Sequence, residues 1–206
     1  MKQYVFYRWC HIALALALLL IIPAVSFASK IIYKTENPFD GEFGLWGYDI
    51  SQNQSAALRF TPEENVTLNQ LSMWFMNNDW SGETHGTVTI TLHEDQSVGD
   101  GKSIPSDNIL ESWTIQTTAD GWDPQQESIV SQVKPVLQAG RNYWVTASSS
   151  DAPHYNAVWC IARFGVGYMS NTQRDHSWVP IGNDQTGAIA SITIEADDSS
   201  TTPVVK

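Results

Sequence analysis

The chain has 206 residues, and its 11 lysines and arginines against 22 aspartates and glutamates give a formal net charge of −11 at pH 7. This balance repels phosphate backbones and anionic bilayers, so it argues against nucleic acid as a partner. Only 16% of the residues are charged, which is fewer than the roughly 25% of an average domain. The length fits one domain with a substantial core.

The first 28 residues predict a secretory signal peptide. Lys2 and Arg8 precede an unbroken apolar run over residues 12–22, and Ser26-Phe27-Ala28 supplies the small residues of a cleavage site. An uncleaved membrane anchor is the alternative, but the apolar run is shorter than the roughly 20 residues that span a bilayer. We therefore expect the general secretory route, cleavage after Ala28, no membrane attachment afterwards, and a secreted or periplasmic protein.

Short runs of β-branched and aromatic residues follow one another along the rest of the chain. In residues 87–93 valine, isoleucine and leucine alternate with threonine and histidine, which is the pattern of a strand with one face in the core. Similar runs occupy residues 43–48, 56–60, 71–76, 109–115, 129–133, 143–147 and 157–164, the neighbourhood of Trp178, and residues 188–194. No window of helical length has a sustained 3.6-residue period. The pattern predicts an all-β, antiparallel, jelly-roll-like β-sandwich in a single domain, residues 29–196.

Turn-forming residues mark the connections between these runs. Residues 94–107 are polar and rich in Asp, Gly and Ser, so we expect a loop there, and residues 120–124 form a second one. Gly140 can adopt the positive φ of the tight turn before the strand that contains Trp144. The polar C-terminal residues 197–206 are expected to be a disordered tail.

Several motifs, taken in order, resemble the bacterial exported choice-of-anchor proteins, many of which carry a PEP-CTERM sorting tail. They are residues 57–61 (Ala-Leu-Arg-Phe-Thr), 88–92 (Val-Thr-Ile-Thr-Leu), 110–113 (Leu-Glu-Ser-Trp) and 137–145 (Leu-Gln-Ala-Gly-Arg-Asn-Tyr-Trp-Val), then Trp159, Trp178 and Gly187-Ala188. The resemblance implies a secreted jelly-roll-like sandwich without an established catalytic activity. The chain ends in Pro203-Val204-Val205-Lys206, without the sorting tail of that family.

Residue types that carry catalysis or bind metals occur without a recognisable spacing. Glu94 and Asp95 are neighbours on a strand and point to opposite faces, and we expect these acids and Glu111 to be solvated at the surface. Asp95, Asp100 and Asp107 are weak candidates for a calcium site, since hard cations bind several such oxygens. We expect no other cofactor, and we interpret Cys160, within an apolar run, as a buried, inert thiol.

Tryptophan is unusually frequent, with 9 in the chain. Those in strand-like runs are expected in the core, but Trp80 and Trp122 lie in polar turns and Trp178 follows a polar segment. An exposed indole could stack on a sugar ring while Asn78 and Asp123 bind its hydroxyl groups. The alternative is that each ring folds back and caps an end of the sandwich, since exposed large aromatic side chains are costly.

These observations favour a non-catalytic binding module for a neutral glycan, because an acidic protein would repel acidic polymers. A second hypothesis is a structural cell-surface or matrix protein that associates with other exported proteins. A third is a glycosidase or lyase on a jelly-roll scaffold, for which two acids would have to face each other across a cleft.

Overall fold

A computed structural model describes residues 29–38, 47–79, 85–162, 167–172, 177–182 and 189–198. The predicted signal peptide, most of the predicted tail, Trp80 and some connecting residues lie outside this part of the chain. The described residues form thirteen strands and no helix: β1 (Lys30–Lys34), β2 (Gly47–Ile50), β3 (Ala56–Phe60), β4 (Val66–Asn77), β5 (Thr87–Gly99), β6 (Lys102–Gln116), β7 (Gln125–Val130), β8 (Val136–Leu137), β9 (Tyr143–Ser148), β10 (Ala157–Cys160), β11 (Tyr168–Thr172), β12 (Trp178–Gly182) and β13 (Ile192–Asp198).

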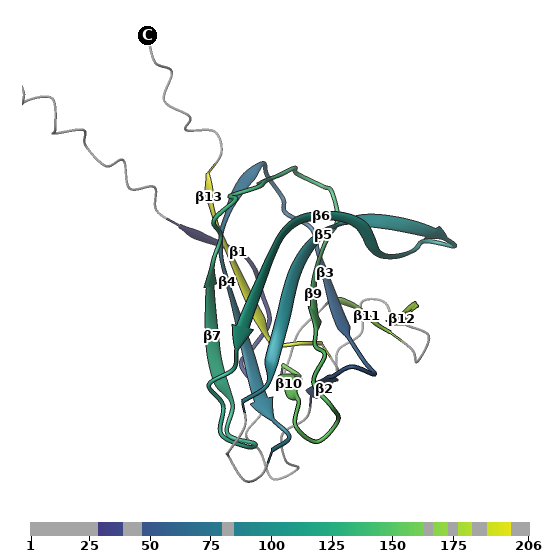
Figure 1. Cartoon of the computed structure of the whole chain (residues 1–206). Coiled ribbons are helices and arrows are strands. Elements are labelled where there is room, and N and C mark those ends of the chain that lie inside the picture. The colour runs from purple at the N-terminus through teal and green to yellow at the C-terminus, as the bar shows by residue number, and fades with distance from the viewer. Residues whose placement is uncertain are drawn as a thin grey trace, which may run out of the picture.

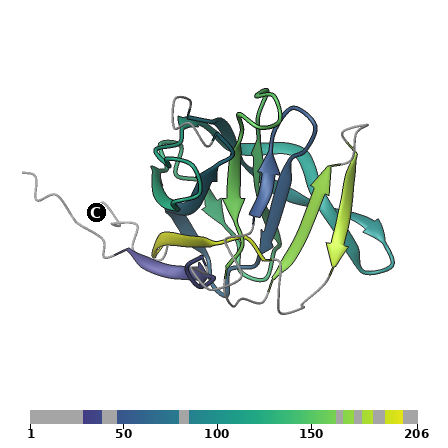
Figure 2. The ribbon, with the colours of Figure 1, turned by 90° about the horizontal axis from the view of Figure 1, so that it is seen from below.

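The strands form two antiparallel sheets that face each other (Figures 1 and 2). One sheet has the order β1-β13-β4-β10-β2. In this sheet β13 and β10 pair with one edge of the long strand β4, and β7 and β8 pair with its other edge. The other sheet has the order β12-β11-β3-β9-β5-β6. The predicted all-β sandwich is therefore confirmed, while its jelly-roll connectivity stays a prediction. In the described part of the chain, no helix is long and apolar enough to cross a membrane.

The core lies between the two sheets and follows the period-two alternation of the strands. On β5, Val88, Ile90 and Leu92 are fully buried, whereas Thr87 and Thr89 on the other face are not. The same alternation turns Leu71, Met73 and Phe75 of β4 inward, where Phe75 lies against the Trp159 ring with 6.5 Å between ring centroids. Burial of these apolar side chains stabilises the sandwich by roughly 1.5–3 kcal/mol for each large one.

The predicted loop at residues 94–107 is wrong, because both sides of it are strand. β5 runs on to Gly99 and β6 begins at Lys102, so the two strands form one long hairpin with a tight turn at Asp100 and Gly101, whose φ angles are 51° and 70°. Polar residues can extend a hairpin in this way, because each strand satisfies the backbone hydrogen bonds of the other. The turn predicted at Gly140 is present, with a φ of 72°.

Side chains of β6 connect the two sheets along one open side of the sandwich. The Trp113 Nε1–H donates to the carbonyl oxygen of Val130 on β7 at 3.2 Å, so an edge strand of one sheet caps an edge strand of the other. Farther along, the Thr118 N–H and hydroxyl both donate to Glu127 Oε1, at 2.6 and 2.7 Å. Such contacts shield edge backbone groups that could otherwise pair with another chain.

Glu111 is buried, so the expectation of a solvated acid at this position is wrong. Only 5% of the residue is exposed, and its carboxylate accepts hydrogen bonds from the Ser131 hydroxyl at 2.6 Å, the Gln132 N–H at 2.6 Å and the Val133 N–H at 3.0 Å. A buried carboxylate persists only with such compensation. Glu111 therefore fixes the turn that joins β7 to β8.

Replacing Glu111 by alanine is expected to lower the free energy of unfolding by about 3 kcal/mol, because the donors of residues 131–133 would lose their acceptor. Urea denaturation followed by circular dichroism measures this change. Glu111→Gln keeps one acceptor oxygen and should cost less, and Glu94→Ala on the neighbouring strand is the surface control. A loss below about 0.5 kcal/mol in Glu111→Ala would show that this hydrogen-bonded turn does not matter for stability.

Candidate functional site

Loops from both sheets converge at one end of the sandwich, the lower end in Figure 1. They are residues 51–55 after β2, 78–79 after β4, 85–86 before β5, 117–124 between β6 and β7, and 149–156 between β9 and β10. We call this region the loop end. It contains three of the sequence-predicted binding residues, Asn78, Trp122 and Asp123, whereas Trp80 lies outside the described residues.

The end of β4 holds two of these loops, one on each side. The Asn77 N–H donates to the carbonyl oxygen of Gly121 at 2.6 Å, and the Asn78 N–H donates to the carbonyl oxygen of Asn156 at 3.0 Å. Successive N–H groups of an extended strand point to opposite sides, so the two loops flank the strand end. Gly121 takes the positive φ of 58° that its turn requires.

An amide and acid network joins β2, β4 and the loop before β10. The Asn78 Nδ2 donates to Asp49 Oδ1 at 2.6 Å, and the Asn156 Nδ2 lies 3.4 Å from the same oxygen. Asn156 is buried, at 1% exposure, whereas Asp49 is exposed and Asn78 is half-buried. The network therefore fixes the side-chain amide of Asn78 and the carboxylate of the exposed Asp49 relative to each other.

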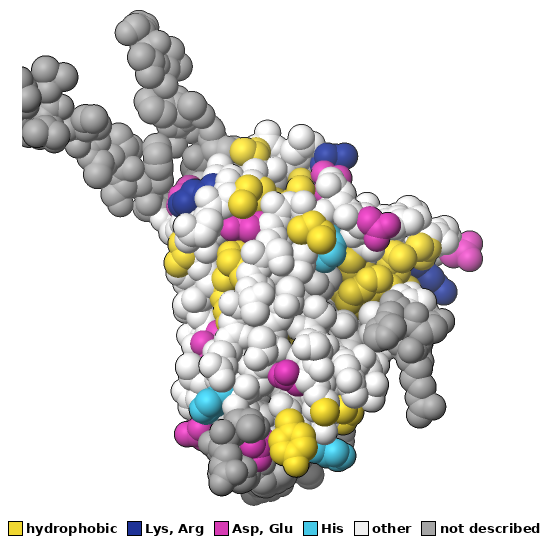
Figure 3. Space-filling model, viewed as in Figure 1, with side chains coloured by type: hydrophobic (Ala, Val, Ile, Leu, Met, Phe, Trp, Pro, Cys, Tyr) yellow, Lys and Arg dark blue, Asp and Glu magenta, His cyan; other side chains and the backbone are white. Residues whose placement is uncertain are grey.

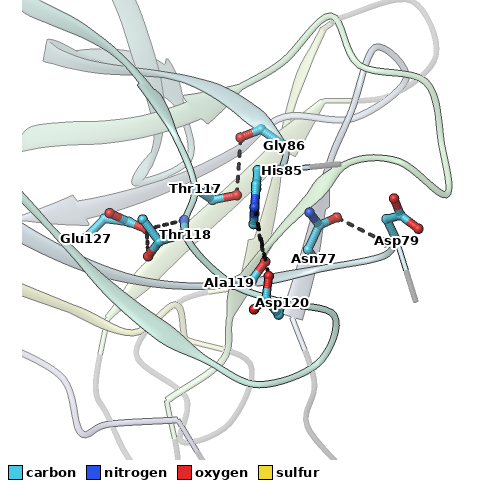
Figure 4. Close-up of polar contacts among 9 residues, drawn as sticks. All are labelled: Asn77, Asp79, His85, Gly86, Thr117, Thr118, Ala119, Asp120 and Glu127. Atoms are coloured by element: carbon cyan, nitrogen blue, oxygen red, sulfur yellow. Dashed lines mark hydrogen bonds and ion pairs between the residues drawn. The ribbon is translucent and has the colours of Figure 1, made fainter. Parts of the chain in front are cut away.

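Polar contacts also hold the loop that carries Trp122, as Figure 4 shows. The His85 ring lies between Ala119 and Asp120: its Nδ1 is 3.3 Å from the Ala119 carbonyl oxygen and its Nε2 is 3.9 Å from Asp120 Oδ1. Asn77 Oδ1 accepts the Asp79 N–H at 3.0 Å, which turns the chain as it leaves β4. The loop is thus held at its start by Thr118, in its middle by His85 and at Gly121 by β4.

Two large aromatic side chains are exposed at the loop end. Trp122 is 40% exposed and follows Gly121, and Tyr155 is 58% exposed and precedes Asn156. Because the N–H groups of Asn77 and Asn78 donate to the carbonyl oxygens of Gly121 and Asn156, the loops that carry Trp122 and Tyr155 lie on either side of the end of β4. Asp123, next to Trp122, is exposed and accepts a hydrogen bond from Gln125 Nε2 at 3.3 Å. Exposed rings beside fixed amides and carboxylates are a common composition of saccharide sites.

Charge is distributed unevenly along the molecule. The described residues of the loop end include no lysine or arginine, and they carry the acids Asp79, Asp120, Asp123 and Asp151, with Asp49 nearby on β2. On the face drawn in Figure 3, the basic side chains lie in the upper half of the molecule, whereas acidic side chains occur in both halves, the lower end included. The loop end therefore repels polyanions more strongly than the net charge alone would suggest.

The structure separates the other predicted site residues from the loop end. Trp178 begins β12 and packs against Ala57, Trp144 and Tyr168 on the outer face of the six-stranded sheet, so it does not join Trp122. The calcium candidates are spread along the hairpin: Asp95 Oδ1 accepts the Trp144 indole N–H at 2.7 Å, and Asp100 occupies the hairpin turn. Within the described ranges, no three His, Cys, Asp or Glu side chains are grouped to hold a metal ion.

Sequence reasoning missed Asp49, Tyr155 and Asn156. Residues 151–156 contain Asp, Pro, His and Asn, a composition typical of a polar surface turn, and this was the one sequence signal for Tyr155 and Asn156. Nothing local could have paired Asp49 with Asn78 and Asn156, because the contact joins segments far apart in the chain. Tyr155 lies within this polar segment, where the sequence allows exposure of an aromatic side chain as it does at Trp122.

Comparison with known proteins identifies no relative. No family model matches this chain, and no curated protein matches it. The geometry of the loop end is therefore the basis for the functional proposal.

Cys160 is buried at 0% exposure, as the sequence indicated, and burial raises the pKa of its thiol to about 12. In protein produced from Ser29 onward, it is the single cysteine. Its reaction with a disulfide reagent at pH 8 is expected to be at least about 100-fold slower in the native state than in 6 M guanidinium chloride, since the thiolate is the nucleophile. Absorbance of the released thiolate measures both rates, and equal rates would contradict the buried position.

Proposed function

We propose that this protein is an exported, non-catalytic binding module whose loop end binds a neutral glycan. One observation carries the proposal: the loops that carry the exposed Trp122 and Tyr155 lie on either side of the end of β4, where the side-chain amide of Asn78 donates to Asp49. Rings of this kind stack on the apolar faces of sugars, and amides and carboxylates bind hydroxyl groups. The signal-peptide pattern of residues 1–28 and the resemblance to choice-of-anchor proteins support export.

Rigidity of the site favours binding. At the loop end, hydrogen bonds to the carbonyl oxygens of residues 121 and 156 and to the Asp49 carboxylate fix the backbone of the loops. The His85 ring contacts the carbonyl oxygen of residue 119. The loops are therefore in place before a ligand arrives. A ligand that meets a preorganised surface loses less conformational entropy on binding. The acids near the site favour a neutral polymer over an acidic one.

A structural role through protein association is the second candidate. Val130, Val133 and Val136 are 50%, 64% and 60% exposed; Val133 lies in the turn that Glu111 fixes, and the other two flank this turn. Rigid apolar side chains at a surface are suited to contacts with another exported protein. Concentration-dependent association in analytical ultracentrifugation, without retention on any glycan, would favour this role over glycan binding.

The proposal is tested by affinity electrophoresis of protein produced from Ser29 onward on a panel of neutral polysaccharides, namely glucans, mannans, xylan and chitin. At least one should retard the wild-type protein. Trp122→Ala should weaken that interaction roughly tenfold, since loss of one stacked ring costs about 1–1.5 kcal/mol. Trp122→Phe should keep part of the affinity, because it keeps an aromatic face.

Ile109→Ala is the matched control, since Ile109 is 55% exposed on β6 outside the loop end. Its retardation should equal that of the wild-type protein. Thermal unfolding of each variant separates a binding defect from a folding defect. An absence of retardation by every polysaccharide, or an equal loss in Ile109→Ala and Trp122→Ala, would refute glycan binding at the loop end.

A further inference from the structure

The outer half of the β5–β6 hairpin is an arm that leaves the sheet. β5 pairs with β9 only as far as Glu94, and from Asp95 onward its strand partner is β6 alone. The register shifts at His93 and again before Asp95, which are irregularities of the kind that bend a strand pair. We call residues 95–107 the arm. In Figure 1 it extends beyond the body of the sandwich on the side of β11 and β12.

The arm covers side chains on the outer face of the six-stranded sheet. Trp144 lies on the face opposite the core residue Val145, yet it is 0% exposed. Its indole N–H donates to Asp95 Oδ1 at 2.7 Å, and the Arg59 Nη1 donates to the Ser103 hydroxyl at 2.9 Å. Side-chain hydrogen bonds thus attach the arm at positions where β5 no longer pairs with β9.

The covered face contains groups able to bind a ligand. Arg59 lies with its guanidinium carbon 4.0 Å from the centre of the Tyr168 ring, and the Tyr168 and Trp144 rings meet edge to face at 5.6 Å. The Ser170 hydroxyl, next to Ala57 in the sheet, is fully buried and has no hydrogen-bond partner.

His93 lies at the base of the arm, between the arm and the sheet. Its Nδ1 is 2.8 Å from the carbonyl oxygen of Ser106 on β6, and its Nε2 is 3.3 Å from the Thr146 hydroxyl on β9. Burial lowers the pKa of the imidazole, and the Ser106 carbonyl and the Asp107 carboxylate only partly oppose this effect. In the closed arrangement, the neutral ring is therefore favoured.

The charged groups around His93 come from three strands. Asp95 lies two residues after His93 on β5, and Asp107 lies on β6. Arg59 lies on β3, separated from His93 by Trp144 of β9, which pairs with both residues. A charged imidazolium would need hydration and would attract the Asp95 carboxylate away from the Trp144 indole. Both effects weaken the attachment of the arm.

We propose that the arm is a proton-operated latch, in which protonation of His93 releases residues 95–107 from Trp144 and uncovers the outer face of the six-stranded sheet. Opening would release the Trp144 indole N–H and the Arg59 guanidinium from their partners on the arm, Asp95 and Ser103. This device is separate from the loop end and does not depend on glycan binding there.

The direction of the pH dependence follows from linkage. The closed form binds the proton less tightly than the open form, in which His93 is hydrated, so opening takes up a proton. Opening is therefore least populated above the ordinary histidine pKa of about 6.5 and becomes more populated as the pH falls below it. The increase levels off once the pH drops below the lowered pKa of the closed form.

Amide hydrogen exchange measured by mass spectrometry at pH 7.5 and pH 5.5, corrected for intrinsic exchange rates, tests the latch on protein produced from Ser29 onward. Protection of amides in residues 96–104 should fall at least about threefold at the lower pH. Each unit of difference between the His93 pKa in the open form and that in the closed form allows a fall of up to about tenfold. Protection in residues 88–92 of the core part of β5 should stay unchanged. Equal protection of the arm at both pH values would overturn the proposal.

In His93→Gln the arm should lose its pH dependence, because glutamine does not titrate in this range. His154→Asn, at an exposed position with a φ of 76°, is the control and should keep it. If His93→Gln does not fold, Asp107→Asn tests the same trigger. The Asp107 carboxylate stabilises the His93 imidazolium in the closed form, so its removal should lower the His93 pKa there further. The loss of arm protection at pH 5.5 should then become larger. A persistent pH dependence in His93→Gln, or an unchanged one in Asp107→Asn, would exclude His93 as the trigger.

Discussion

The double pairing of β4 is the constraint on which the rest of the structure depends. Along residues 70–73 this strand pairs with β13 on one side and β7 on the other, so it crosses the middle of its sheet with both rows of backbone groups satisfied. Its inward side chains form much of the core, and its last two N–H groups hold the loops that carry Trp122 and Tyr155. Fold and candidate site are therefore parts of one hydrogen-bond ladder.

The class of fold could be read from alternation, because inward and outward residues of a half-buried strand differ in polarity. Residues 87–93 and 71–76 show this alternation, and β5 and β4 contain them. The arm could not be recognised, because its strands bury little apolar surface and are held by pairing with each other. Asp95 and Ser103 acquire their roles from Trp144 and Arg59, which are distant in the chain.

Local turn chemistry could be read from the sequence, whereas long-range contacts could not. The Asp120-Gly121-Trp122-Asp123 segment predicted a turn but left open whether its indole is exposed or caps an end of the sandwich, and Trp122 is 40% exposed. Trp178 also follows a polar segment, but its ring packs on Trp144 and Tyr168. The sequence does not specify which face of the sheet this ring covers. Glu111 resembled a surface acid because its three donors, in residues 131–133, come from another strand connection.

Glycan binding at the loop end is the central claim. NMR titration of isotope-labelled protein tests it most directly, with an oligosaccharide of the neutral polysaccharide that retards the protein most strongly in electrophoresis. The account predicts saturable shifts of the Trp122 indole N–H and of the amides of Asn78, Tyr155 and Asn156, with the Trp144 indole unchanged. Shifts centred on Trp144 and Trp178, or shifts that do not saturate, would contradict it.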